Sequence, residues 1–96
     1  MTELEQKLTL AVAGLESGEV VSFGDIAARA GYPKNARAAG KLLSQAMHQL
    51  PWWRVVYSSG KLPPCDQRRQ TDLLEAEGVS VEAGRVVSSP LGRFKD

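Results

Sequence analysis

The chain has few residues whose types could carry covalent or metal chemistry. Its 96 residues include one cysteine, Cys65, and one histidine, His48. A thiol becomes a nucleophile only when a nearby base or positive charge favours the thiolate. Cys65 lies in a Pro-Pro loop, far along the chain from the tryptophan pair at residues 52 and 53. His48 has no companion ligands that would predict a metal site. We therefore expect no catalytic residue, no metal and no cofactor.

A tryptophan pair is the stretch best suited to binding. The run Pro51-Trp52-Trp53-Arg54-Val55-Val56 contains both tryptophans of the chain. A tryptophan joins a large apolar ring to a polar N–H, so such a pair can fill a core or form the wall of a pocket. One ring can also take each role. We favour a pocket wall.

The start of the chain predicts a scaffold helix over residues 2–16. Thr2 and Glu5 have the spacing of a capping box, and apolar residues then recur at helical intervals. Ser17-Gly18 is expected to end this helix.

The next segments predict a helix-turn-helix. Ser22 is a good N-cap for a short helix over residues 23–30, which Gly31 ends. Asn35 can then cap a second helix over residues 36–47. Two short helices joined by a tight glycine-containing turn are typical of this motif, although many helical pairs share the outline.

The second helix has a flat surface and one unusual charge. Its first two turns are nearly all Ala and Gly, so it can approach either a neighbouring helix or a groove wall closely. Arg37 is poorly placed for the helix dipole, which favours an anionic partner. The net charge is only +1, but residues 29–61 contain basic side chains and no acidic ones. The basic residues are Arg29, Lys34, Arg37, Lys41, Arg54 and Lys61.

The remainder predicts short elements. Residues 54–57 favour a β-strand, and Asp66 can cap a last helix that Gly78 ends. Residues 79–81 and 85–87 predict a small hairpin or wing, and residues 88–96 a loosely held tail. We expect a mainly α fold: one winged helix-turn-helix domain with short β elements over residues 1–96. Without a leader or an apolar run long enough to span a membrane, we expect a cytoplasmic monomer that does not contact membranes.

Several of these segments together resemble the C-terminal domain of O6-alkylguanine-DNA alkyltransferases. The resemblance covers roughly residues 18–78 and rests on motifs in the family order: Gly18–Ala27, Pro33–Gly40, Pro51–Val56, Ser59-Gly60 and Leu73–Gly78. The repair enzymes carry Pro-Cys-His-Arg-Val where this chain has Pro-Trp-Trp-Arg-Val. Trp52 thus stands at the alkyl-acceptor cysteine, as in the alkyltransferase-like proteins, which have no transferase activity. Those proteins usually keep the histidine, and here that position is Trp53.

The resemblance implies a role for particular residues. The helix-turn-helix would dock in the minor groove, and Arg37 would be the arginine finger that fills the space left by a flipped nucleotide. Phe23 stands at the family's tyrosine, and Glu77 at the acid that supports the histidine, which we interpret as structural here. The expected DNA contacts are Phe23, Lys34, Asn35, Ala36, Arg37, Gly40 and Lys41. The expected lesion pocket is formed by Trp52, Trp53, Arg54, Val55, Ser59, Gly60, Leu62 and Pro63, and its shortened loop predicts a roomy cavity.

We therefore expect a non-enzymatic sensor of O6-alkylguanine in double-stranded DNA. The family role implies a signal to nucleotide excision repair, with UvrA as the partner. One alternative is a helix-turn-helix regulator that reads sequence without lesion specificity, although the Ala-rich second helix offers few base-reading groups. Residual transfer to Cys65 is a third hypothesis, which a gain of one alkyl group in protein mass would support.

Overall fold

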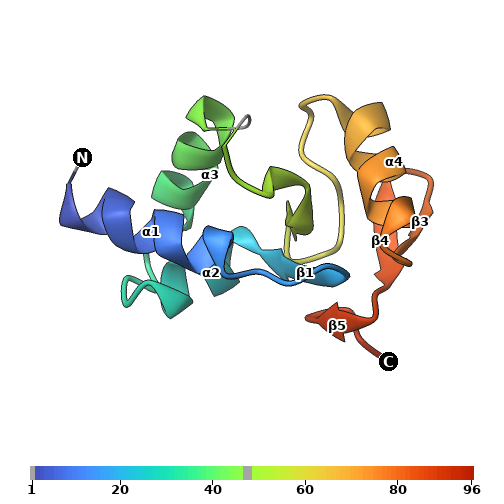
Figure 1. Cartoon of the computed structure of the whole chain (residues 1–96), viewed down its shortest axis with the longest axis horizontal. Coiled ribbons are helices and arrows are strands. Elements are labelled where there is room, and N and C mark those ends of the chain that lie inside the picture. Colours follow the sequence, from blue (N-terminus) through green and yellow to red (C-terminus); the bar gives the residue numbers. More distant parts are fainter. Residues whose placement is uncertain (1, 47–48) are drawn as a thin grey trace.

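In the computed structural model, which describes residues 2–46 and 49–96, four α-helices are combined with short strands (Figure 1). The fold therefore has the expected class. His48 and the expected helix end at Met47 lie outside the described residues. The elements in chain order are α1 (Glu3–Ala13), β1 (Glu19–Ser22), α2 (Phe23–Arg29), α3 (Ala36–Gln45), the 3-10 turn η1 (Trp52–Arg54), β2 (Val55–Val56), α4 (Gln67–Ala76), β3 (Ser80–Glu82), β4 (Arg85–Ser88) and β5 (Leu91–Gly92).

Helix α1 begins where its capping box predicts and ends earlier than expected. The Thr2 hydroxyl accepts from the Glu5 N–H, and the Glu5 carboxylate accepts from the Thr2 N–H. The last helical residue is Ala13, and Gly14 is the C-cap, so the helix does not reach residue 16. Leu8 and Val12 are buried against α2 and α3.

The α2–α3 pair confirms the predicted helix-turn-helix. Ser22 caps α2 by accepting from the Asp25 N–H, and Gly31 follows the helix with a φ of +89°. Asn35 occupies the N-cap position of α3, but its side chain makes no capping hydrogen bond.

A three-stranded parallel sheet links this motif to the tryptophan segment. β1 lies in the middle, with Val21 opposite Val55 of β2 and Glu19 opposite Leu91 of β5. The prediction of a loose tail at residues 88–96 is therefore wrong. The tail is fixed by its pairing with β1 and by an ion pair between Arg93 and Asp25.

The C-terminal part is a helix with a hairpin. β3 and β4 form the predicted antiparallel hairpin, turned by Ala83 and Gly84, both with positive φ. Helix α4 begins after Asp66, whose backbone is left-handed and whose side chain makes no cap, contrary to expectation. Gly78 follows its end with a φ of +85°.

Two apolar clusters meet at η1. One is built from the helices α1, α2 and α3 and includes Trp52, and the other lies between β2, α4 and the hairpin and includes Leu62. Trp53 packs against both clusters. The segment expected as a strand over residues 54–57 is thus a tight turn followed by a two-residue strand, which places neighbouring side chains on different faces.

Candidate functional site

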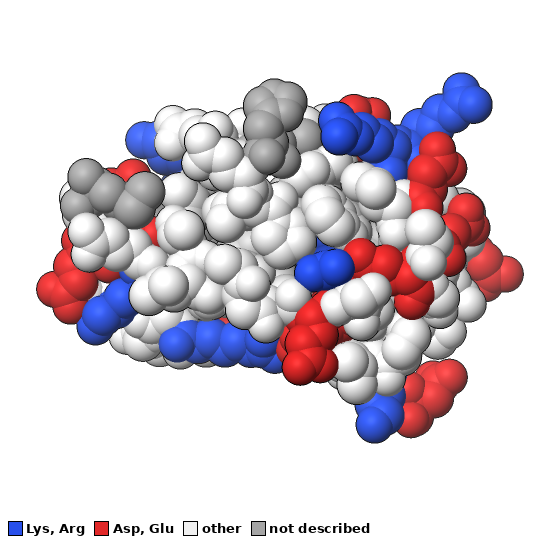
Figure 2. Space-filling view, in the orientation of Figure 1, with Lys and Arg blue, Asp and Glu red and all other residues white. Residues whose placement is uncertain are grey.

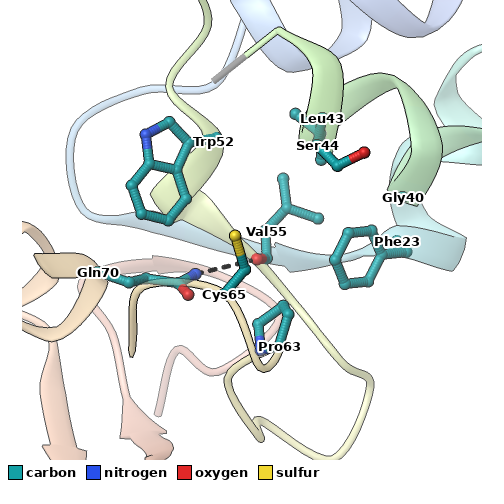
Figure 3. A pocket seen from close by; sticks show the side chains of 9 residues that line it. All are labelled: Phe23, Gly40, Leu43, Ser44, Trp52, Val55, Pro63, Cys65 and Gln70. Carbon is teal, nitrogen blue, oxygen red and sulfur yellow. Dashed lines mark hydrogen bonds between the residues drawn. The ribbon is translucent and has the colours of Figure 1, made fainter. Parts of the chain in front are cut away.

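An apolar pocket lies where α3, η1 and the segment 61–66 approach one another (Figure 3). Its cavity volume is about 80 Å³, so it is narrower than the roomy pocket that the sequence predicts. It is lined by Phe23, Gly40, Leu43, Ser44, Trp52, Val55, Pro63, Cys65 and Gln70. Small-molecule pockets usually measure roughly 300–1,000 Å³, so a base can enter only if a wall moves outward.

Three of the residues expected in the lesion pocket line this cavity. They are Trp52, Val55 and Pro63, and two of the expected DNA contacts, Phe23 and Gly40, join them. Trp52 is buried, with 7% of its surface exposed, and its ring lies edge-on to that of Trp53. The tryptophan pair therefore divides its roles, as the sequence allowed.

The other expected pocket residues are placed elsewhere. Leu62 is fully buried in the second apolar cluster, and Ser59 is exposed on a turn. Gly60 has a φ of +91° and packs so closely on β4 that a Cβ would lie 2.6 Å from the Val86 carbonyl oxygen. This contact leaves no room for a side chain at residue 60. The Ser59-Gly60 motif therefore supports the hairpin rather than the pocket.

Trp53 and Arg54 are tied to one carboxylate on the opposite side of η1. The Glu77 carboxylate accepts from the Trp53 indole N–H at 2.9 Å, from the Arg54 guanidinium at 2.7 Å and from the Gly18 N–H at 2.8 Å. Arg54 also donates to the Leu15 carbonyl oxygen at 2.8 Å and stacks over the Trp53 ring at 5.1 Å. These bonds join the connection between α1 and β1 to η1 and to the C-terminal end of α4, which agrees with a structural role for Glu77.

The network determines the charge state of Glu77. Burial raises the pKa of this carboxyl group, but the hydrogen bonds from Arg54, Gly18 and Trp53 together outweigh burial. The pKa therefore lies below its ordinary value of 4.5. Glu77 is thus held as a carboxylate, which is a poor state for a proton donor.

The basic residues expected to face an anion separate into two groups. Arg54 and Arg29 are paired with acids of the protein itself: Arg54 lies 2.7 Å from Glu77 in a largely buried pair, and Arg29 lies 2.8 Å from Glu19 at the surface. Lys34, Arg37, Lys41 and Lys61 are exposed, and the first three lie on α3 or just before it, so the positive surface is centred on the helix-turn-helix. Asn35 and Ala36 are half-buried at the start of α3.

Within residues 2–46 and 49–96, the structure has no group of three metal-ligating side chains and no helix that is long and apolar enough to cross a membrane. The arrangement offers an apolar slot beside a positively charged helix. Such a slot can hold a flat ring by contact with other rings, and its few polar groups can orient that ring.

Comparison with known proteins identifies the fold. Residues 3–79 match the family described as "6-O-methylguanine DNA methyltransferase, DNA binding domain". The chain belongs to this family.

Relatives of this methyltransferase family add detail. A "DNA base-flipping protein" of Vibrio parahaemolyticus is 44% identical over 77 residues, covering 75% of this chain and 77% of the relative. "Alkyltransferase-like protein 1" of Schizosaccharomyces pombe is 33% identical over 101 residues, covering 99% and 89%. The crystal structure of the S. pombe protein Atl1 with damaged DNA containing O6-carboxymethylguanine has a TM-score of 0.77 at 34% identity, covering 85% of this chain and 82% of that one.

Sequence reasoning missed several residues around the pocket of this family member. Leu43, Ser44, Cys65 and Gln70 line the cavity, and Cys65 lies close to the tryptophan segment although its place in the sequence suggested distance. Arg68 and Arg69 are exposed in the first turn of α4, where Figure 2 shows basic side chains gathered. Arginines at a helix N-terminus oppose the dipole, and the argument applied to Arg37 could have found them.

Proposed function

We propose that the chain binds O6-alkylguanine in double-stranded DNA by flipping the nucleotide into the Trp52 pocket and holding it there without chemical change. The observation that carries this proposal is the apolar slot between the helix-turn-helix and segment 61–66, with a buried tryptophan as its wall. Its support is the likeness to proteins named for base flipping and to one solved with damaged DNA.

Two replacements at the reacting positions of the repair enzymes account for the lack of transfer that we propose. By the resemblance to the repair enzymes, Trp52 stands at the acceptor cysteine, and an indole offers no nucleophile to an alkyl carbon. Trp53 stands at the position of the neighbouring histidine and donates its N–H to Glu77, so this position offers no imidazole to accept a proton. A protein of this kind retains the lesion and marks it.

Arg37 would replace the extruded nucleotide in the base stack. Extrusion costs a few kcal/mol, and a guanidinium stacked between neighbouring bases offsets part of that cost. Lys34 and Lys41 flank Arg37 and would contact phosphates, while the small residues of α3 allow the helix to approach the groove closely. A cytoplasmic signal to nucleotide excision repair, with UvrA as the partner, completes the proposal.

Equilibrium binding to matched duplexes tests this function. One duplex carries O6-methylguanine and the other guanine at the same position, and intact protein mass is measured before and after binding. We expect tighter binding to the lesion and an unchanged mass. Equal affinities would refute lesion recognition.

Arg37→Ala tests the docking mode. We expect about a tenfold or greater loss of lesion affinity, because one stacked or phosphate-paired arginine contributes about 1–3 kcal/mol. Arg85→Ala is the control, since Arg85 is exposed on β4, which Figure 1 shows at the opposite end of the molecule from α3. Equal effects of the two substitutions would remove Arg37 from the mechanism.

One observation favours a second candidate function. Because Cys65 lines the pocket, its thiolate could attack the alkyl carbon, breaking the carbon–oxygen bond so that the electron pair stays with the guanine oxygen and a proton is then taken up. This transfer would be established if the wild-type protein gains the mass of one alkyl group and the Cys65→Ser variant does not. An unchanged mass supports the non-enzymatic function.

A further inference from the structure

The pocket contains one polar side chain that is buried and only half satisfied. Gln70 is 1% exposed and extends from α4 to the pocket wall. Its amide nitrogen donates to the carbonyl oxygens of Trp53 at 3.1 Å and Val55 at 3.2 Å. Its Oε1 accepts no hydrogen bond from the residues described by the structure.

The orientation of this amide is fixed by its neighbours. Two carbonyl oxygens face the nitrogen, so rotating the amide by half a turn would place its oxygen against two other acceptors. The Oε1 is therefore a preoriented acceptor. Figure 3 shows the amide reaching the Val55 carbonyl below the Trp52 ring, beside Cys65 and Pro63.

An orphaned buried acceptor in a native protein calls for an explanation. Nearly all buried polar atoms have a partner, because an unmade hydrogen bond costs the full desolvation of the group. In a pocket with mainly apolar walls, the few polar groups orient the ligand and select it. A ligand that brings a donor to Oε1 would supply the missing hydrogen bond.

We propose that Gln70 Oε1 accepts a hydrogen bond from the exocyclic 2-amino group of the flipped purine. The inference rests on the proposed function and makes it more specific. O6-alkylation removes the proton from N1 of guanine, so the 2-amino group is the donor that remains on the Watson–Crick edge of the base. An acceptor at this place selects guanine-derived lesions over 6-substituted purines that lack the 2-amino group.

Access to Oε1 requires the pocket to widen. The cavity of about 80 Å³ is too small for a ligand of this class, and Pro63 and Cys65 form one of its walls. Outward movement of segment 61–66 would both admit the base and uncover the Gln70 oxygen. The apolar side chains of Trp52, Phe23 and Leu43 then remain as the surroundings for the O6 substituent.

The test compares two lesions and two proteins. The lesions are O6-methylguanine and 6-methoxypurine, which differ only in the 2-amino group, placed in the same duplex. We expect the wild-type protein to prefer O6-methylguanine by about tenfold, the effect of one hydrogen bond to a buried acceptor. In Gln70→Met, which has no acceptor oxygen, we expect that preference to disappear. The two duplexes also differ in base pairing, but this difference is the same for both proteins. Dividing the preference of the wild-type protein by that of Gln70→Met therefore isolates the contribution of Gln70.

Gln67→Met is the matched control. Gln67 lies one turn earlier on α4, and its amide nitrogen also donates to a backbone carbonyl, that of Leu62 at 3.0 Å. This variant should lose stability but keep the preference for the 2-amino group.

Three results would overturn the inference. Equal binding of the two lesions by the wild-type protein, with each lesion placed opposite an abasic site so that neither base is paired, does so without any variant, even if Gln70→Met fails to fold. Equal weakening of both lesions in Gln70→Met would assign Gln70 a structural role alone. If O6-methylguanine binds no better than guanine, the proposed function itself fails, which the unmodified duplex reveals separately.

Discussion

The two sides of η1 differ in how completely their polar groups are satisfied. On the Trp53 side, one carboxylate receives hydrogen bonds from an indole, a guanidinium and a backbone N–H. On the Trp52 side, apolar walls surround a small cavity, and the Gln70 oxygen has no partner among the described residues. Two adjacent tryptophans thus belong to environments of opposite character.

Within the three residues of η1, one side chain therefore contributes mainly to stability and its neighbour mainly to binding. A satisfied network joins distant segments and gains little from a ligand, whereas a buried acceptor in an apolar slot costs stability unless a donor reaches it. The network holds η1 in place, so the Trp52 ring keeps a fixed position without support from a ligand. Substitutions on the two sides should therefore affect different measurements.

The largest effect is expected from Glu77→Gln. The introduced amide can still accept hydrogen bonds, but the Arg54 guanidinium, whose side chain is 14% exposed, would lose its counter-charge. Breaking a buried ion pair from one side costs about 3–5 kcal/mol, so we expect a loss of about 3 kcal/mol in the free energy of unfolding. Chemical denaturation measures this change, with Glu75→Gln on the exposed face of α4 as the control. A loss below that of the control would show that the network is not the main support of η1.

The same residue predicts the direction of acid sensitivity. The pKa of Glu77 is lower in the folded protein than its ordinary value of 4.5, so the unfolded chain binds the proton more tightly. The stabilisation is complete above that ordinary pKa and is lost as the pH falls through the folded pKa. The unfolding midpoint of the wild-type protein should therefore drop with acid more steeply than that of Glu77→Gln. Some dependence will remain in the variant, because the pKa of Glu19 is also lowered: burial raises it, but hydrogen bonds from the Glu16 N–H and Arg29 outweigh this. Parallel pH profiles would contradict the assignment.

The tryptophan pair allows the same substitution on both sides. Trp53→Phe removes the indole N–H that bonds Glu77 at 2.9 Å, and we expect a loss of about 1 kcal/mol in stability with an unchanged lesion preference. Trp52→Phe should reduce the lesion preference by about tenfold, because a smaller ring covers less of a base that stacks or packs against it. Both quantities are measured for both variants. If Trp53→Phe reduces the lesion preference as much as Trp52→Phe does, the two tryptophans do not have separate roles in stability and binding.

Local sequence signals predicted the helical half of the molecule well. Ser22, Gly31 and Gly78 act through contacts within a few residues, so caps and positive-φ positions can be identified from the sequence. The hairpin was also predictable, because its turn at Ala83 and Gly84 lies between two β-prone runs. The pairing of β5 with β1 was not predictable, since Leu91 and Gly92 have no strand pattern and their partner lies far away in the chain.

The candidate site could be predicted only where its residues share a segment. Trp52 and Val55 lie in one motif, and both line the pocket. Arg54 was expected there as well, but its guanidinium turns to a carboxylate just after α4, a choice made by tertiary contacts between residues 23 positions apart. Gln70 and Cys65 reach the pocket only because α4 packs on η1, and nothing in their local sequence indicates this.

The smallest effect is expected at Gly40, on the pocket side. Glycine inside a helix costs about 0.5–1 kcal/mol relative to alanine, and a Cβ at Gly40 would meet only the Phe23 ring at 3.8 Å, an ordinary contact. Gly40→Ala should therefore stabilise the free protein by about that amount. It should also weaken lesion binding, because the added methyl group occupies a wall of the pocket on a helix proposed to approach DNA. Gly24→Ala is the matched control in α2, where a Cβ would meet only the Ser22 hydroxyl at 3.7 Å and the pocket is not involved. If both variants gain stability and neither loses lesion affinity, close approach of α3 to DNA is not needed. Gly40 would then not be a position at which the protein gives up stability for binding.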